Sequence, residues 1–214
     1  PVLGAYFNPV HSNKAKVKTG QEKFADHLKK ASLFGAKFVA SETGSYNDEP
    51  WTYNPKNQTE EAFQEVKKIF SPLAIAAKEN STFASIEGAW HHCIFCPEQM
   101  KRLLDELNVS ELGDGHVFTT VDIFNYLYIG NYQQRYEIFD KALELFKGKI
   151  ACFHVKDFIV DGDSLKEVAI GTGIMGWDKL LPQIVKNVPD PILVFEGVPE
   201  KEKSLAYFKG LLEK

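Results

Sequence analysis

Cysteine is scarce in this chain of 214 residues, which has three: Cys93, Cys96 and Cys152. Three cysteines cannot build the disulfide framework of a small secreted protein. Cys93 and Cys96 form one C-x-x-C pair, but there is no second pair to complete a four-cysteine zinc site. The pair also lies far from the start of the chain, where a thioredoxin-like redox motif would be expected. We therefore expect free, partly buried thiols.

Long apolar runs and blocks of like charge are also absent. No stretch approaches the ~20 apolar residues of a membrane span, and the first residues show no export signal, so the sequence predicts a cytoplasmic protein. The 25 basic and 29 acidic side chains give a net charge of −4 without a basic stripe. This balance argues against a nucleic-acid partner.

Linkers rich in glycine, serine or proline are missing too, so we expect one domain over residues 1–214. Hydrophobic residues make up 44% of the chain and charged residues 25%, a mixture that excludes disorder.

The chain does contain a repeated alternation between two patterns. Short runs rich in Val, Ile and Phe predict strands over residues 2–7, 37–41, 82–87, 117–122, 149–154 and 191–196. Apolar residues at helical spacing lie between these runs and after the last one. In the second of these helices, Pro72 is expected to kink or split the helix.

The predicted strands lack an alternation between apolar and polar residues, so both of their faces are expected to be buried. Strands of this kind, separated by helices, indicate a parallel α/β architecture. An open nucleotide-binding sheet would place a glycine-rich turn after the first strand, but Asn8-Pro9-Val10-His11 stands there. The alternative is a TIM-type (β/α) barrel.

Four successive predicted strands end in side chains that can bind a metal: Glu87, Asp122, His154 and Glu196. The carboxyl ends of all strands lie on one rim of a parallel barrel, so the four side chains would share one cavity. Buried carboxylates need compensation from shared protons, from lysines or from a cation. Oxygen-rich ligation with one nitrogen suits Mn²⁺, Mg²⁺ or Co²⁺. Taken singly, each residue could instead be a helix cap, a loop residue or a satisfied core group.

These strand ends resemble the sugar phosphate isomerase/epimerase family, which has a xylose-isomerase-like TIM barrel. The similar segments are residues 40–45, Ile86-Glu87, Val121-Asp122 with Asn125, residues 153–157, Gly171 with Gly173, and residues 195–197. By this resemblance, Glu87, Asp122, His154 and Glu196 hold one divalent metal ion (Mn, Mg, Co or Zn). Glu87 and Glu196 are then also the catalytic acid/base pair.

The resemblance also implies an isomerase or epimerase that acts on a small sugar or sugar phosphate. It would remove a proton next to a carbonyl through a metal-stabilised enediolate. The substrate-binding residues expected from it are Glu42, His92, Asn125, Lys156 and Asp157. The substrate shell of the ketose 3-epimerase branch is not retained, because Cys93, Asn125 and Val160 stand at three of its positions.

The same register makes the strand over residues 2–7 the third strand of the barrel. Six of the eight β/α units are then present, and the first two are missing. We expect either a fragment of a longer protein or sheet edges covered by a partner subunit, as in a homodimer.

Two other functions remain open, and a third, a nuclease, is disfavoured because the chain offers one rim histidine, His154, and a net charge of −4. An inosose-type dehydratase would use the same scaffold, metal and base as a lyase, and a non-catalytic barrel remnant would bind no metal. A nuclease of the endonuclease IV type would need more rim histidines and a basic surface.

Overall fold

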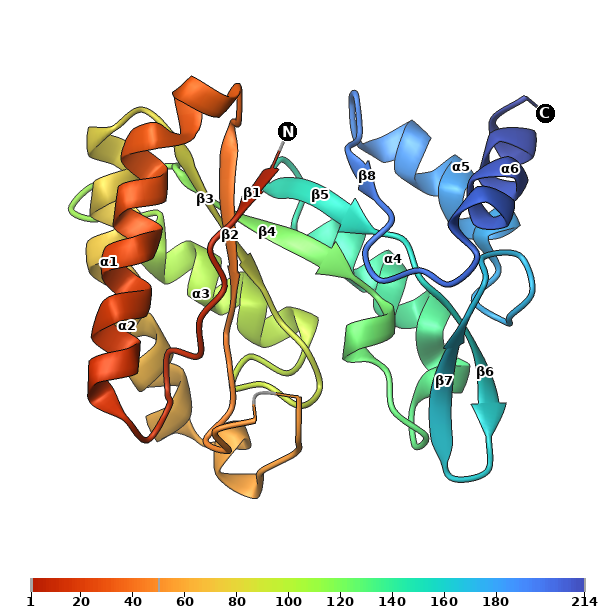
Figure 1. The fold of residues 1–214 in the computed structure, drawn as a ribbon, viewed down its shortest axis with the longest axis horizontal. Coiled ribbons are helices and arrows are strands. Elements are labelled where there is room, and N and C mark those ends of the chain that lie inside the picture. The colour runs from red at the N-terminus through yellow and green to blue at the C-terminus, as the bar shows by residue number, and fades with distance from the viewer. Residues whose placement is uncertain (1, 50, 214) are drawn as a thin grey trace. The chain divides into compact units, whose positions relative to one another are not determined.

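The computed structural model describes residues 2–49 and 51–213 and divides the chain into two compact units (Figure 1). The first unit extends to Thr120 and the second begins at Val121. The single domain expected from the sequence stays a prediction.

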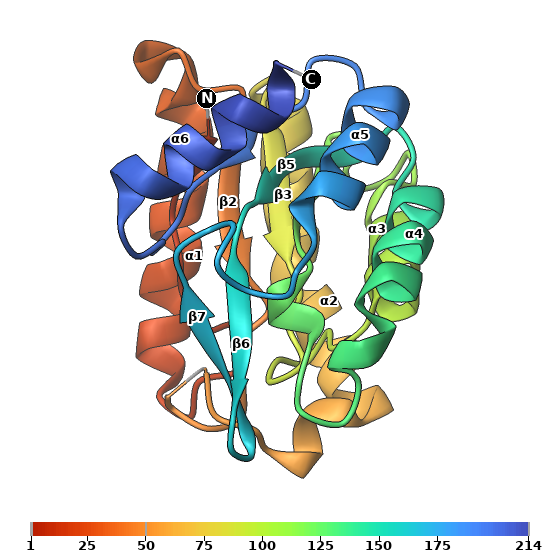
Figure 2. The ribbon, with the colours of Figure 1, turned by 90° about the vertical axis from the view of Figure 1, so that its right-hand side faces the viewer.

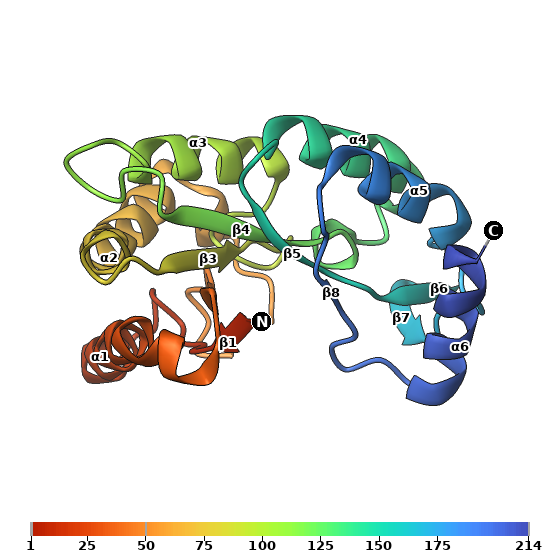
Figure 3. The ribbon, with the colours of Figure 1, turned by 90° about the horizontal axis from the view of Figure 1, so that it is seen from above.

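The first unit contains parallel strands flanked by helices. Its strands are β1 (Val2–Gly4), β2 (Phe38–Glu42), β3 (Phe83–Glu87) and β4 (Val117–Asp122), paired in that order and all parallel. Its helices are α1 (Lys14–Lys30), α2 (Glu60–Glu79) and α3 (Pro97–Leu107). The three helices lie on one side of the strands (Figure 3).

Local sequence signals explain where these helices begin. The Asn13 side chain accepts hydrogen bonds from the backbone at the start of α1, and the Thr59 hydroxyl does the same for α2. Of the kink or split expected at Pro72, the split is wrong, because α2 continues through this residue. The buried face of α2 carries residues such as Phe63 and Phe70 along its length, and this packing outweighs the one backbone hydrogen bond that proline removes.

Strand β4 crosses the boundary between the units, since Val121 and Asp122 belong to the second unit. The second unit continues with β5 (Ile150–His154) and β8 (Leu193–Val194), which are parallel neighbours. In the described part of the chain, one sheet has the strand order β1-β2-β3-β4-β5-β8. These six strands lie at the six predicted positions, although β1 and β8 are shorter than expected.

The second unit also has an antiparallel hairpin of β6 (Asp157–Asp161) and β7 (Ser164–Val168), which forms a two-stranded sheet of its own (Figure 2). This hairpin was not predicted, although the Asp161-Gly162-Asp163 turn is a signal for two short strands. The helices of this unit are α4 (Arg135–Leu145), α5 (Trp177–Asn187) and α6 (Lys201–Leu212). Among the described residues, no helix is both long and apolar enough to span a bilayer.

Candidate functional site

Two glutamates of the first unit stand side by side at the carboxyl ends of their strands. Glu42 ends β2, Glu87 ends β3, and the two are direct partners in the parallel register. Both are buried, with 7% and 3% of their surfaces exposed. Register partners project from the same face of a sheet, so two acidic side chains share one buried region. Two buried carboxylates repel each other, so a positive charge nearby would lower the free-energy cost of keeping both ionised.

The next strand, β4, ends at Asp122. The hydroxyls of Ser85 on β3 and Thr120 on β4 lie 2.8 Å apart in a hydrogen bond, so these two side chains share a face. Glu87 is two residues beyond Ser85, and Asp122 is two residues beyond Thr120. Alternate residues of a strand point to the same side. Glu87 therefore lies on the same face of β3 as Ser85, and Asp122 on the same side of β4 as Thr120.

Within the second unit, three of the four predicted metal ligands lie close together. The His154 Nδ1 atom is 3.1 Å from Glu196 Oε2 and 3.7 Å from Asp122 Oδ2. Asp122 and His154 are buried, whereas the Glu196 side chain is 44% exposed. The buried pair is held by the ends of β4 and β5, and Glu196 follows β8 in an irregular segment.

Hydrogen bonds and a nearby positive charge favour the ionised form of both carboxylates. Burial opposes the charge of Asp122, but His154 and Lys156 outweigh it and hold the pKa of Asp122 below its ordinary value. The pKa of Glu196 is lowered chiefly by the hydrogen bond with His154, against an opposing effect of burial. The carboxylates of Asp122 and Glu196 are thus in the ionised form that a metal ligand requires.

This donor set fits a divalent cation. Atoms bound to one cation at about 2.1–2.3 Å lie roughly 3–3.7 Å from each other. The two distances from His154 Nδ1 fall in this range. Two carboxylates and one imidazole suit a hard or borderline ion, while a soft thiolate-binding ion would find no sulfur ligand among them.

Lys156 supplies the positive charge of the cluster in this structure. Its Nζ atom lies 3.0 Å from Asp122 Oδ2, 3.9 Å from Glu196 Oε2 and 3.5 Å from Asn125 Oδ1. The Asn125 backbone N–H donates to Asp122 Oδ1 at 3.1 Å. The structure therefore brings the predicted residues Asn125 and Lys156 to the cluster of Asp122, His154 and Glu196.

Asp157 is occupied differently. It is buried, and its two carboxylate oxygens accept four backbone N–H groups, from Phe158, Gly171, Gly173 and Met175, at 2.8–3.0 Å. A Cβ at Gly173 would collide with the Asp157 carboxylate, which explains the glycine there. This geometry supports a role for Asp157 in fixing the loop before α5; direct substrate contact by Asp157 stays a prediction.

Glu167 on β7 is a further acidic side chain near the cluster that the sequence analysis did not single out. Burial is the main cause of its raised pKa, and the charges of Asp122 and Glu196 add to it, whereas Lys156 lowers it. The short alternating run of β7 carried no sign that this hairpin would stand close to the strand ends.

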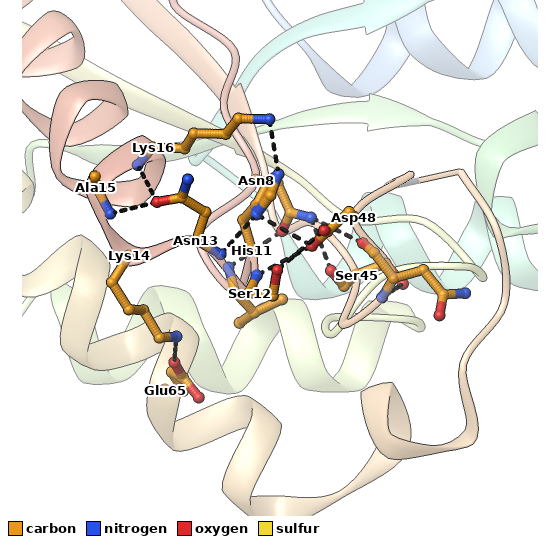
Figure 4. Close-up of polar contacts among 12 residues, drawn as sticks. Asn8, His11, Ser12, Asn13, Lys14, Ala15, Lys16, Ser45, Asp48 and Glu65 are labelled. Atoms are coloured by element: carbon orange, nitrogen blue, oxygen red, sulfur yellow. Dashed lines mark hydrogen bonds and ion pairs between the residues drawn. The ribbon is translucent and has the colours of Figure 1, made fainter.

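Asn8 and His11, in the loop after β1, tie that loop to the loop after β2 (Figure 4). The Asn8 amide donates to the carbonyl oxygens of Ser45 and Asn47 at 2.8 and 3.1 Å, and His11 Nδ1 lies 3.1 Å from Asp48. Gly44 sits at φ +60°, and a Cβ there would collide with the Asn8 side chain. These contacts position the loop that carries Trp51.

His92 lies beneath Trp51 in the first unit. Its ring is fully buried, and the two ring centroids are 4.5 Å apart. The C-x-x-C pair nearby is not oxidised, and Cys93, Cys96 and Cys152 are all free, as expected.

These observations define a β/α protein with parallel strands and a carboxylate–histidine cluster at the strand ends. Residues 1–211 match the family model described as the xylose isomerase-like TIM barrel. The chain belongs to this family, and the fold predicted from the sequence is confirmed: a TIM-type (β/α) barrel represented by six strands. A search of curated proteins gives no match.

Solved structures show the same fold at low sequence identity. A D-tagatose 3-epimerase-like protein is 18% identical with a TM-score of 0.73, over 99% of this chain and 76% of that protein. The probable 3-DHS dehydratase AsbF of Bacillus anthracis is 12% identical with a TM-score of 0.72, over 99% and 75%. A xylose isomerase-like TIM barrel protein from Mycobacterium smegmatis, in complex with magnesium, is 12% identical with a TM-score of 0.69, over 93% and 67%. The chain thus spans two thirds to three quarters of their lengths.

Proposed function

We propose that this protein is a divalent-metal-dependent isomerase or epimerase of a small sugar or sugar phosphate. The observation that carries the proposal is the cluster of Asp122, His154 and Glu196, whose nitrogen and oxygen atoms have the spacing of ligands around one cation. Glu87 is proposed as the fourth ligand, because it is buried, offers a carboxylate oxygen and ends β3, as Asp122 ends β4 and His154 ends β5. The ion is Mn²⁺, Mg²⁺, Co²⁺ or Zn²⁺.

The bound ion would act as a Lewis acid that polarises the substrate carbonyl and stabilises the negative charge of the enediolate. Glu196 is the proposed base: its ionised, half-exposed carboxylate accepts the proton from the carbon next to the carbonyl. Glu87 returns a proton to the opposite face, which inverts the centre, or to the neighbouring carbon, which isomerises the sugar. His154 stays neutral when it acts as a ligand.

Other residues of the site hold the substrate in this proposal. With Asp122 bound to an ion, the Lys156 ammonium would be available to a substrate oxygen. Asn125, which hydrogen-bonds both Asp122 and Lys156, would orient that ammonium. Glu42 offers a carboxylate to a sugar hydroxyl beside Glu87.

A dehydratase of the inosose type is the alternative, and the fold shared with a probable dehydratase keeps it open. Such an enzyme would use the same base but expel water. A barrel remnant without activity is the other alternative.

Proton NMR in D₂O distinguishes these functions. A chelator first removes any bound metal from the protein, which is then loaded with Mg²⁺. The Mg²⁺-loaded protein is mixed with a panel of ketoses, their phosphates and inosose. An isomerase or epimerase incorporates deuterium next to the carbonyl and forms a new sugar, whereas a dehydratase forms an unsaturated product. Glu196→Gln should abolish either change, while Glu202→Gln, an exposed glutamate on α6, should not. Absence of exchange and product with the whole panel contradicts the proposal.

A further inference from the structure

The His92 side chain is enclosed without any hydrogen bond. Its exposed fraction is 0%, and among the described residues neither ring nitrogen has a hydrogen-bond partner. A neutral imidazole has one N–H donor and one nitrogen acceptor, and buried groups of this kind are normally paired. An apolar side chain would suit this enclosure better, so stability of the fold does not explain a histidine here.

Trp51 forms the cover of His92. The indole ring lies 4.5 Å from the imidazole at an interplanar angle of 44°, while Trp51 is itself 43% exposed. The side chain of Asn47 holds this part of the loop by donating to the carbonyl oxygens of Thr52 and Tyr53. An exposed ring on an irregular loop can move away without disturbing the core.

The base of this loop is firmly attached, in contrast to Trp51. Asn57 is fully buried, and its amide donates to the His91 carbonyl at 2.6 Å and to the Ser45 hydroxyl at 2.9 Å. The Cys93 backbone N–H donates to the Gly44 carbonyl at 2.9 Å. These bonds join the loops after β2 and β3, so motion of Trp51 would leave His92 in place.

We propose that Trp51 and His92 form a hydroxyl-binding subsite in which a sugar displaces the indole and hydrogen-bonds the imidazole that it covered. This inference rests on the proposed function, because both residues lie in the loops that follow the carboxyl ends of β2 and β3, next to Glu42 and Glu87. A sugar hydroxyl both donates and accepts, as the two nitrogens of a neutral imidazole require.

The chemistry of the surroundings indicates which part of a substrate binds here. Tyr53 and Trp90 stack at 5.4 Å with an interplanar angle of 5°, so aromatic faces suited to the apolar side of a sugar stand close by. The nearest strand ends carry two buried glutamates rather than cations. Burial also lowers the pKa of His92 to about 3, so the imidazole brings no positive charge. The subsite therefore takes a neutral, hydroxyl-bearing end of a sugar and disfavours a phosphate.

Calorimetric titration of the Mn²⁺-loaded protein tests this subsite. The probes are D-tagatose, D-fructose, myo-inositol and inorganic phosphate. We expect the wild type to bind at least one neutral probe, and we expect His92→Leu to weaken that binding tenfold or more. The Mn²⁺ affinity of His92→Leu should stay within twofold of that of the wild type. The urea midpoint of His92→Leu should be equal or higher, whereas loss of a histidine that stabilises the fold would lower it. His116→Leu, at the opposite end of β4, is the control and should leave sugar binding unchanged.

Chemical modification tests the cover without any sugar. Diethylpyrocarbonate should modify His92 in Trp51→Ala and leave it intact in the wild type, as read by peptide mass. Equal modification of both proteins, unchanged sugar affinity in His92→Leu, or phosphate as the preferred probe would each overturn the subsite. So would a wild type that binds Mn²⁺ but none of the neutral probes. A wild type that binds no Mn²⁺ would instead contradict the proposed function, and the modification result would still decide whether Trp51 covers His92.

Discussion

The hydroxyls of Ser85 and Thr120 share a hydrogen bond of 2.8 Å across neighbouring parallel strands. The two side chains therefore share a face of β3 and β4. Glu87 lies two residues beyond Ser85 on that face of β3, and Asp122 two residues beyond Thr120 on the same side of β4.

Loss of one cluster member should weaken metal binding. Asp122→Asn keeps the volume but removes one charge, so its Mn²⁺ affinity should fall by about 100-fold or more, beyond the loss of about 10–100-fold for a residue that only supports a ligand. Calorimetry or the EPR signal of free Mn²⁺ measures the change. Asp161→Asn, an exposed aspartate of the β6–β7 hairpin, is the matched control. Equal affinity of the two variants would remove Asp122 from the ligand set.

Strand position and strand-end chemistry could be predicted from the sequence because both depend on local pattern. Apolar runs marked the six strands, and Glu87, Asp122 and His154 each followed such a run. The β6–β7 hairpin was missed because its residues are too few and too mixed in polarity to form a clear pattern.

Side-chain partners could not be predicted in the same way. The four N–H groups around Asp157 come from residues up to 18 positions away, and no spacing rule reports such a loop. The cover of His92 by Trp51 likewise joins two loops whose conformations depend on contacts such as those of Asn57.

Asp157→Asn should destabilise the fold. The amide that replaces one oxygen would face two N–H donors, leaving them unpaired and buried. Each unpaired group costs about 1–3 kcal/mol, so the free energy of unfolding should fall by roughly 2–6 kcal/mol. Urea denaturation measures it, with Asp163→Asn at the exposed hairpin turn as the control. A loss below about 0.5 kcal/mol, as at ordinary surface positions, would show that the Asp157 carboxylate does not hold the loop.

The buried His92 should make the fold sensitive to acid. Its pKa is about 3 in the folded protein because burial opposes the charged form, against 6.5 as its ordinary value. Between these pH values the unfolded chain binds the additional proton, so stability falls as the pH drops from 6.5 toward 3. One such group contributes a slope of about 1.4 kcal/mol per pH unit.

Urea unfolding of wild type and His92→Leu across pH 8 to 4 isolates this contribution. Their difference in unfolding free energy should be constant above pH 7 and should shift in favour of the leucine variant below pH 6.5. If the difference in unfolding free energy did not change with pH, the His92 imidazole would take up its proton equally well in the folded and unfolded states, which would contradict the prediction.

Cys93 should be almost inert toward thiol reagents. Burial raises its pKa to about 12, so the reactive thiolate is about a thousandfold rarer at pH 7.5 than in a free cysteine. Ellman's reagent should therefore give the same native progress curve for wild type and Cys93→Ser, and one thiol fewer for the variant in urea. A fast phase lost in Cys93→Ser would contradict this burial.

Diffraction from crystals grown with Mn²⁺ tests the metal site most directly. The account predicts an anomalous peak at about 2.0–2.6 Å from oxygen atoms of Glu87, Asp122 and Glu196 and from a ring nitrogen of His154, with the Lys156 ammonium moved away from Asp122. A protein saturated with Mn²⁺ that shows no peak among these four side chains, with Lys156 still paired to Asp122, would contradict it.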